Sequence, residues 1–433
     1  MSAHRSGRLI ANRFGRYLSK LERSLGHADR ALPFRSYVTG LLLPGDRKSV
    51  EPMAARVAPD RVRAVHQSMH HFVATSPWQS DALLSKVREL VLPTIEKHGA
   101  ITSWIIDDTG IPKKGTASVG VSHQYCGQLG KQANCQVAVS LSIANDFASL
   151  PIAYQLYLPK SWTDDRRRCR AVGVPSSVRF LTKPEIALRH LRGACAAALP
   201  RGVVVADAAY GNNTEFRENV AELGLQYMMA IQASTTVWRL DEEPVQPSRR
   251  KRLGRPPLIL KRRRGKSPIT LGDLARDLPA SAFADITWRE GTKAALSSRF
   301  AALRVHVAHR DELRHAVRPA EWLLIEWPIA EEQPRKYWFS NLPETTPLSE
   351  LVAHAQRRWR IERDYQELKD EIGLDHYEGR SWFGFHHHAA LCIAAYGFLA
   401  AEHGIFSLPD VRAALAQPAL PASFRPRGAT ATR

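Results

Sequence analysis

The sequence predicts an α/β protein that begins with a helical region and carries a mainly β segment inserted late in the chain. Apolar residues recur at helical spacing up to about residue 95. Short apolar runs that end in acidic residues then alternate with helical stretches, as is typical of an α/β sheet. From about residue 234 to 345 this alternation breaks, and strand-like runs and basic segments replace it.

The N-terminal region shows the amphipathic pattern of a small helical bundle. Helices are expected over Leu9–Leu25, Ala58–Ala74 and Ser76–Leu92. Residues 1–95 are therefore predicted to form a basic, all-helical domain. DNA binding is a hypothesis for this domain, because helical bundles serve many purposes.

The first part of the α/β region contains a strand that stops at two acids. The apolar run Ile101–Ile106 leads into Asp107 and Asp108, and a glycine and a proline follow shortly afterwards. Turn-forming residues separate the next two strand-like runs, 136–143 and 151–158, which predicts an antiparallel hairpin. The acids at the end of the first strand mark a candidate site, although aspartates also end strands simply because turns favour them.

A second acid follows a fully apolar strand. Val203–Ala206 lacks polar alternation, so it is expected to lie centrally in a sheet covered on both faces, with Asp207 at the sheet rim. Helices are expected over 183–198 and 214–223, and another strand over 226–231. Residues 96–233 are thus predicted to form the first part of the catalytic core.

The charge balance points to a polyanionic partner. The 433 residues contain 61 Lys and Arg against 42 Asp and Glu, a formal net charge of +19. Such a surplus favours nucleic acid as a partner. No apolar run is long enough to span a bilayer, the first residues do not resemble a signal peptide, and the five cysteines are scattered. A cytoplasmic, nucleoid-associated protein with no membrane partner is expected.

A basic arm is expected within the segment 234–345. No acid occurs between residues 249 and 266, and Arg252 and Arg255 lie in this run. The Gly-Arg-Pro core around Arg255 suggests insertion into a DNA minor groove, with a generic solvated loop as the alternative. Strand-like runs over 304–308, 322–327 and 336–341 complete a predicted β-rich insertion.

A carboxylate embedded among cations marks the next segment, 346–405. At helical spacing, Arg358, Glu362, Tyr365 and Lys369 fall along one face. A surface helix with ion pairs is one interpretation of this pattern. The other is that Glu362 holds a metal ion while the cations hold a polyanion. Two-metal phosphodiester cleavage needs carboxylates from different elements, and Asp107, Asp207 and Glu362 meet that need.

The sequence resembles the DDE transposases of bacterial insertion sequences, in the group marked by a Y-(2)-R-(3)-E-(6)-K signature. Arg358, Glu362 and Lys369 match its last three positions, whereas Ala355 stands where the signature has tyrosine. The family's first aspartate precedes a Ser or Thr by two positions, as Asp107 precedes Thr109, so Asp107 is assigned and Asp108 is kept as the alternative. Asp207 matches the second aspartate.

The resemblance covers about residues 100 to 400 and implies both a fold and an activity. It implies a ribonuclease H-like core interrupted by the β insertion, with the glutamate on the second part of the core. The alternating Ala, Pro and Arg beyond Pro409 separately predict a flexible tail over 406–433. It implies Mg²⁺ as the cofactor, with Mn²⁺ as a substitute, held by Asp107, Asp207 and Glu362. Arg358 and Lys369 would contact DNA, as would Arg252 and Arg255 of the basic arm.

The implied reaction is nicking at transposon ends followed by transfer of the 3′-hydroxyl to target DNA. The implied partners are double-stranded DNA, as terminal repeats and target, and a second copy of the chain in a synaptic homodimer. Two alternatives remain at the level of the sequence: an inactive DNA-binding descendant of a transposase, and a nuclease with the same core that does not recombine DNA.

Overall fold

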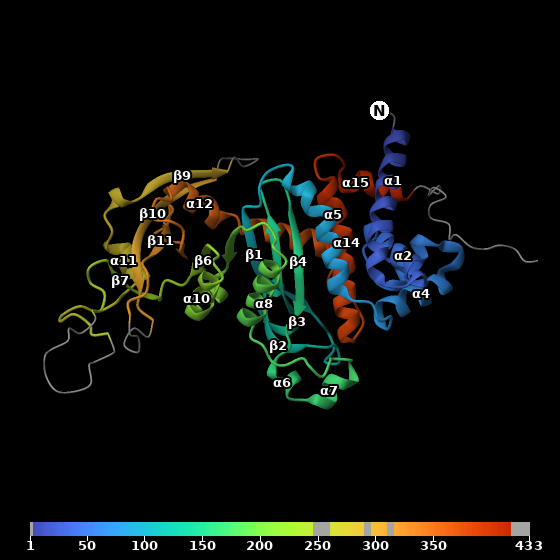
Figure 1. Ribbon diagram of the computed structural model, residues 1–433, viewed down its shortest axis with the longest axis horizontal. Coiled ribbons are helices and arrows are strands. Elements are labelled where there is room, and N and C mark those ends of the chain that lie inside the picture. Colours follow the sequence, from blue (N-terminus) through green and yellow to red (C-terminus); the bar gives the residue numbers. More distant parts are fainter. Residues whose placement is uncertain (1–2, 246–259, 290–295, 310–315, 417–433) are drawn as a thin grey trace, which may run out of the picture. The chain divides into compact units, whose positions relative to one another are not determined.

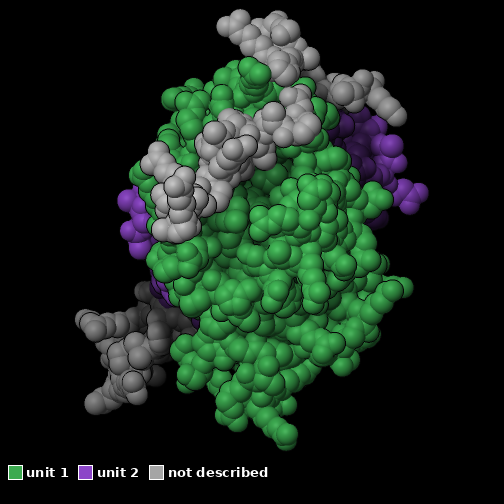
Figure 2. Space-filling model, turned by 90° about the vertical axis from the view of Figure 1, so that its right-hand side faces the viewer, with its two compact units in different colours: residues 1–102, 107–190, 360–433 green, residues 103–106, 191–359 purple. Residues whose placement is uncertain are grey.

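The computed structural model describes residues 3–245, 260–289, 296–309 and 316–416. The chain divides into two compact units (Figure 2). Unit 1 comprises residues 1–102, 107–190 and 360–433, and unit 2 comprises residues 103–106 and 191–359. Helices and strands occur in both, which confirms a mixed α/β protein. Among the described residues, no helix is long and apolar enough to cross a membrane.

Unit 1 combines the N-terminal helices with a small sheet and the C-terminal helices. Its helices are α1 (Ala3–Leu21), α2 (Ala31–Leu42), α3 (Val50–Val57), α4 (Val62–Ala74), α5 (Ser80–Glu96), α6 (Lys160–Thr163), α7 (Arg166–Ala171), the first part of α8 (Lys183–Ala196), α13 (Trp359–Gln366, from its second residue), α14 (Trp382–Glu402) and α15 (Leu408–Leu415). Its strands are β2 (Ser122–Cys126), β3 (Lys131–Ala144), β4 (Ser149–Leu156) and the second part of β1 (Ser103–Pro112).

Helix α14 holds this unit together. It is apolar around most of its circumference, so nearly all of it is buried. It packs against β4 and α5, and also against the N-terminal helices α2 and α4 (Figure 1). The predicted hairpin is confirmed, because β3 and β4 pair antiparallel. The predicted third helix begins at Ser80, after a turn in which the Trp78 amide donates to the Ser76 carbonyl.

Unit 2 is built on one path of paired strands. The strand order is β1, β5 (Val203–Ala206), β6 (Tyr227–Ile231), β12 (Lys336–Ser340), β11 (Glu321–Glu326), β10 (Leu296–Val307), β7 (Thr236–Arg239) and β8 (Ile269–Thr270), and β9 (Ala284–Arg289) pairs with β10. Its helices are α9 (Ala208–Gly211), α10 (Thr214–Glu222), α11 (Leu271–Asp277) and α12 (Leu348–Gln356). Strand β5 runs parallel to both β1 and β6, which confirms its predicted central position.

The three strand-like runs predicted before residue 345 are present as β10, β11 and β12. Strand β12 pairs antiparallel with β6, so the later strands extend the sheet that begins at β5. Trp338, Phe300 and Leu324 form a buried cluster with Leu351 and Val352 of α12. These β strands therefore share a core with the helix that precedes the glutamate segment.

One local expectation, the flexible tail, differs from the structure. Within the predicted tail 406–433, residues Leu408–Leu415 form α15, because Ser407 and Asp410 make a reciprocal capping box and Val411 is buried. Near the start of α14, His387 and His388 are buried, and His386 is half-buried. The His387 ring nitrogens lie 3.0 and 2.8 Å from the Val73 and Trp78 carbonyl oxygens, so this ring links α14 to the N-terminal helices.

Candidate active site

Strand β1 presents two neighbouring aspartates in different environments. Successive side chains on a strand point to opposite faces, so Asp107 and Asp108 face apart. Asp108 forms an ion pair with Lys183 at 2.7 Å. Burial raises the pKa of Tyr365, and the negative charge of Asp107 is the next contribution in the same direction. Asp107 therefore lies near Tyr365 on the helix that carries Glu362, and Asp108 pairs with Lys183 of α8.

Helix α13 carries Glu362 and is fixed by the residues around it. The Arg360 guanidinium donates to the carbonyls of Asn145 and Asp146, at 2.7 and 3.0 Å, in the turn between β3 and β4. The Tyr365 hydroxyl hydrogen-bonds the Ser140 hydroxyl on β3. With Tyr365 buried against the sheet, Glu362 lies on the exposed side of the helix. The segment thus holds an exposed carboxylate on a rigidly anchored helix.

A buried carboxyl on the same helix provides a second anchor. Asp364 accepts hydrogen bonds from Ser149 of β4, at 2.5 Å, and from Tyr396 of α14, at 2.9 Å. Burial raises the pKa of Asp364 to about 6, although both hydrogen bonds act in the opposite direction. Asp364 joins α13 to β4 and α14, and nothing in the sequence pattern distinguished it from its exposed acidic neighbours.

This raised pKa predicts a pH dependence of stability. The folded pKa of Asp364 lies above the unfolded value, so stability should fall as pH rises from about 4 to about 6, by up to about 1.4 kcal/mol per pH unit. Asp364→Asn should remove this contribution. Chemical denaturation of both proteins at pH 4.5 and pH 6.5 measures it. An equal pH dependence in the two proteins would show that Asp364 is ionised at both pH values.

Lys369 lies beyond Glu362 in a π-helical turn, Glu367–Glu371. Its ammonium donates to the Gly110 carbonyl of β1 at 3.1 Å and to Gln128 at 3.3 Å. Burial lowers the pKa of Lys369, while nearby carboxylates, Asp107 among them, act to raise it. The cation therefore lies beside the strand that bears Asp107, and its role as a phosphate contact stays a prediction.

The predicted single helical face from Arg358 to Lys369 is wrong at both ends. Helix α12 ends at Gln356, Arg358 lies in a turn, and α13 begins at Trp359. The chain crosses from unit 2 to unit 1 between Trp359 and Arg360, and the helix breaks at this crossover. The π-helical turn then changes the helical register before Lys369. Ala355, at the signature's tyrosine position, is buried in the cluster of unit 2.

Asp207 follows β5 directly, as predicted. Its carboxylate accepts a hydrogen bond from the Ala209 amide at 2.9 Å and caps the short helix α9. Gly211 ends this helix against β6, where a Cβ atom would lie 1.9 Å from the Ala230 carbonyl oxygen. Close backbone packing in unit 2 therefore fixes the loop that holds Asp207.

The family model of the DDE superfamily endonucleases matches residues 20–295. The chain belongs to this family. The matched range includes Asp107 and Asp207 and ends before Glu362. A probable transposase for insertion sequence element IS701 from Microchaete diplosiphon is 31% identical over 214 residues, which are 49% of this chain and 52% of that protein. The chain thus spans about half the length of the curated relative it matches.

DDE superfamily endonucleases are generally dependent on divalent metal ions. Asp107, Asp207 and Glu362 offer the oxygen donors that such ions prefer. Within residues 3–245, 260–289, 296–309 and 316–416, no three His, Cys, Asp or Glu side chains are grouped so that they could hold a metal ion. Asp107 and Glu362 belong to unit 1 and Asp207 belongs to unit 2. The donor chemistry of the three carboxylates fits a divalent metal ion.

Two predicted DNA contacts of this DDE family member lie outside the described residues. These are Arg252 and Arg255 of the basic arm.

A further residue, Arg217, stabilises the part of unit 2 that holds Asp207, and the sequence pattern does not indicate it. The Arg217 guanidinium is buried, donates to the Gly211 carbonyl and lies 3.6 Å from Glu321. An arginine in an amphipathic helix gives no sign of burial until its partner on a distant strand is known.

Proposed function

We propose that the protein is a DNA transposase that nicks DNA at the ends of an insertion sequence and joins the freed 3′-hydroxyl to target DNA. The observation that carries this proposal is the parallel register of β1 and β5, in which Ser103 pairs with Val203 and Ile105 with Val205. Asp107 and Asp207 each follow the last of these pairs by two residues. Asp107 lies within β1 and Asp207 directly follows β5, so the two acids stand at corresponding positions along neighbouring parallel strands and can share a ligand site.

In this proposal Asp107, Asp207 and Glu362 hold Mg²⁺, or Mn²⁺ in its place, on a ribonuclease H-like core. Bound divalent ions would polarise the scissile phosphate and stabilise both the attacking and the leaving oxygen. Lys369, anchored at Gly110, would orient a phosphate oxygen beside β1. Arg358 would contact the DNA backbone from the turn before α13. Asp108 has no part in this chemistry, because Lys183 neutralises it.

The domain division predicted from the sequence belongs to the same proposal. Residues 1–95 would bind DNA, residues 96–233 and 346–405 would form the core, and residues 234–345 would be the insertion. Terminal repeats and target DNA would be the partners, and a homodimer would hold two ends together. A net charge of +19 supports DNA as the partner.

A joining assay tests the proposed activity. The protein is incubated with Mg²⁺, supercoiled plasmid and a pre-cleaved DNA fragment that ends at the boundary of the element flanking this gene. A covalent fragment–plasmid product is expected. Cutting without joining would indicate a nuclease that does not recombine DNA, and binding without cutting would indicate an inactive descendant. Either of these results would overturn the proposal.

A further inference from the structure

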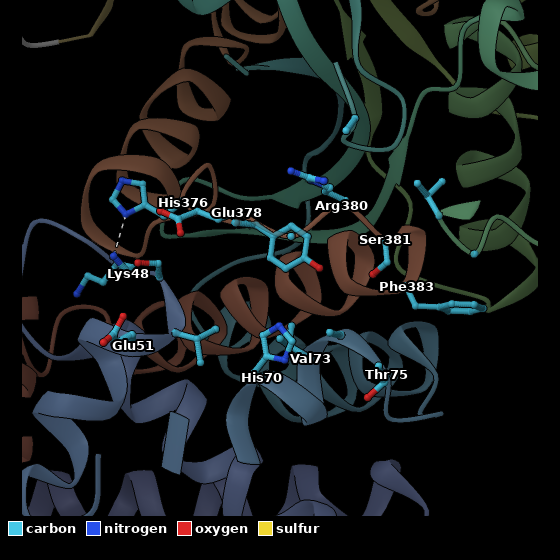
Figure 3. A pocket seen from close by; sticks show the side chains of 18 of the residues that line it. Lys48, Glu51, His70, Val73, Thr75, His376, Glu378, Arg380, Ser381 and Phe383 are labelled. Atoms are coloured by element: carbon cyan, nitrogen blue, oxygen red, sulfur yellow. Dashed lines mark hydrogen bonds between the residues drawn. The ribbon is translucent and has the colours of Figure 1, made fainter. Parts of the chain in front are cut away.

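Unit 1 holds a cleft of about 1040 Å³ that the proposed chemistry does not use. Figure 3 shows its two long walls. Glu51, His70 and Thr75 lie along one wall, and the other wall follows the segment 376–383 into the start of α14. Arg168 of α7 also lines the cleft. Pockets for small molecules commonly measure about 300–1,000 Å³, so this cleft has room for more than one nucleotide.

The cleft continues into a second hollow of about 480 Å³. The residues that line both hollows are Arg47, Ser49, His376, Tyr377 and Glu378. The second hollow is also lined by Lys113 and Lys114, which directly follow the end of β1. Because these lining residues are shared, the two hollows are adjacent, and we refer to them together as the channel. It connects the N-terminal helices to the end of the strand that bears Asp107.

Cations line this channel, and one of them, Arg47, forms an exposed ion pair. Arg168 and Arg380 line the large cleft, and the side chain of Arg380 is exposed. Arg47 forms an ion pair with Glu378 at 2.5 Å, and both side chains are largely exposed, at 71% and 64%. Exposed pairs of this kind contribute little to stability, so a phosphate can replace Glu378 as the partner of Arg47.

Aromatic surface accompanies these cations. Phe383 is 46% exposed at the end of the cleft, an unusual exposure for a large apolar ring. The Arg168 guanidinium lies 3.6 Å from the centre of the Trp162 ring, and this stacking fixes its position. Proteins that bind single-stranded nucleic acid combine a cationic groove with aromatic rings on which bases stack. Hollows of about 1040 and 480 Å³ suit a few nucleotides of one strand better than a duplex.

We propose that this channel binds an unpaired segment of DNA strand next to the cleavage site. Phosphates lie on Arg47, Arg168 and Arg380, and a base stacks on Phe383. The inference rests on the proposed function, because opening or nicking of DNA at Asp107 supplies the unpaired strand. It adds a binding site, formed by α3, α4, α7 and the segment 376–383, to the carboxylates of the candidate active site.

Binding of short labelled oligonucleotides to the full chain tests this inference. Fluorescence anisotropy is measured with a single-stranded oligonucleotide and with its duplex, in EDTA so that no cleavage occurs. Arg380→Ala and Phe383→Ala should each weaken binding of the single strand about tenfold and change duplex binding much less. Arg192→Ala is the control, since Arg192 is exposed on α8, outside residues 1–95, and does not line the channel. This variant should bind the single strand nearly as tightly as the unmodified protein.

Glu378→Gln should have the opposite effect on binding of the single strand. Removing this carboxylate frees Arg47 for phosphate, so binding of the single strand should tighten severalfold. The inference is overturned if Arg380→Ala and Phe383→Ala bind the single strand as the control does, or if Glu378→Gln weakens binding. Nicking is scored separately in Mg²⁺. If the unmodified protein nicks DNA and the channel variants bind the single strand normally, the channel proposal is rejected and the proposed activity stands. If the channel variants bind the single strand more weakly but the unmodified protein does not nick DNA, the proposed activity is rejected and the channel proposal stands.

Discussion

Asp107→Asn and Asp207→Asn should each reduce the rate of DNA nicking by about a thousandfold or more. Loss of a metal-holding carboxylate removes several kcal/mol of transition-state stabilisation, and about 1.4 kcal/mol corresponds to a tenfold change in rate. DNA binding should stay close to that of the unmodified protein, because neither change alters the cationic surface. Single-turnover nicking and a filter-binding assay on the same DNA measure the two quantities.

Asp108→Asn is the control for this pair. Asp108 is adjacent to Asp107 in sequence but forms an ion pair with Lys183 at 2.7 Å, so its loss should slow nicking less than tenfold. If Asp108→Asn abolished nicking while Asp107→Asn preserved it, Asp108 would be the first carboxylate of the site. If Asp207→Asn nicked DNA at the normal rate, Asp207 would not be one of the metal-holding carboxylates.

Gly211→Ala should destabilise unit 2 by about 3 kcal/mol or more. The added Cβ atom would lie 1.9 Å from the Ala230 carbonyl oxygen, so α9 or β6 would have to move. Since Asp207 caps α9, the same movement should displace this carboxylate and lower nicking. Denaturant unfolding at constant pH measures the loss of stability.

Gly193→Ala is the matched change in open space. Gly193 lies on the exposed side of α8, and a Cβ atom there would have no atom within 4 Å. Alanine is the better helix former, so this variant should gain up to about 1 kcal/mol. Equal stability of the two variants would contradict the close packing of α9 against β6.

Features that depend on local hydrophobic pattern could be predicted from the sequence. The runs before Asp107 and Asp207 are apolar, and each forms a strand. Strand β5 ends directly before Asp207 as predicted. The prediction that the first strand ends at Asp107 is wrong, because β1 continues through both aspartates to Pro112. The hairpin of β3 and β4 follows from two such runs around a turn-forming segment. The family resemblance is confirmed by the match over residues 20–295. Assignment of the site residues themselves stays a prediction.

Features that depend on distant packing could not be predicted in this way. The break at Arg358 follows from the passage of the chain between two units, which helical periodicity does not encode. His387 looks polar in the sequence, but carbonyls of Val73 and Trp78 satisfy its ring in the interior. The burial of Asp364 likewise depends on Ser149 and Tyr396, which lie far away along the chain.

Glu362 lies beyond the residues 20–295 matched to the family, so its participation in metal binding is tested directly. Calorimetric titration of Mn²⁺ into the full chain compares Glu362→Gln with Glu367→Gln. Glu367 lies farther along the same helical segment and pairs with Arg363 at 3.1 Å, so its replacement should leave Mn²⁺ binding unchanged. The account predicts that Glu362→Gln weakens Mn²⁺ binding at least about tenfold, as loss of one of three ligands implies. Equal binding by both variants and the unmodified protein would contradict it.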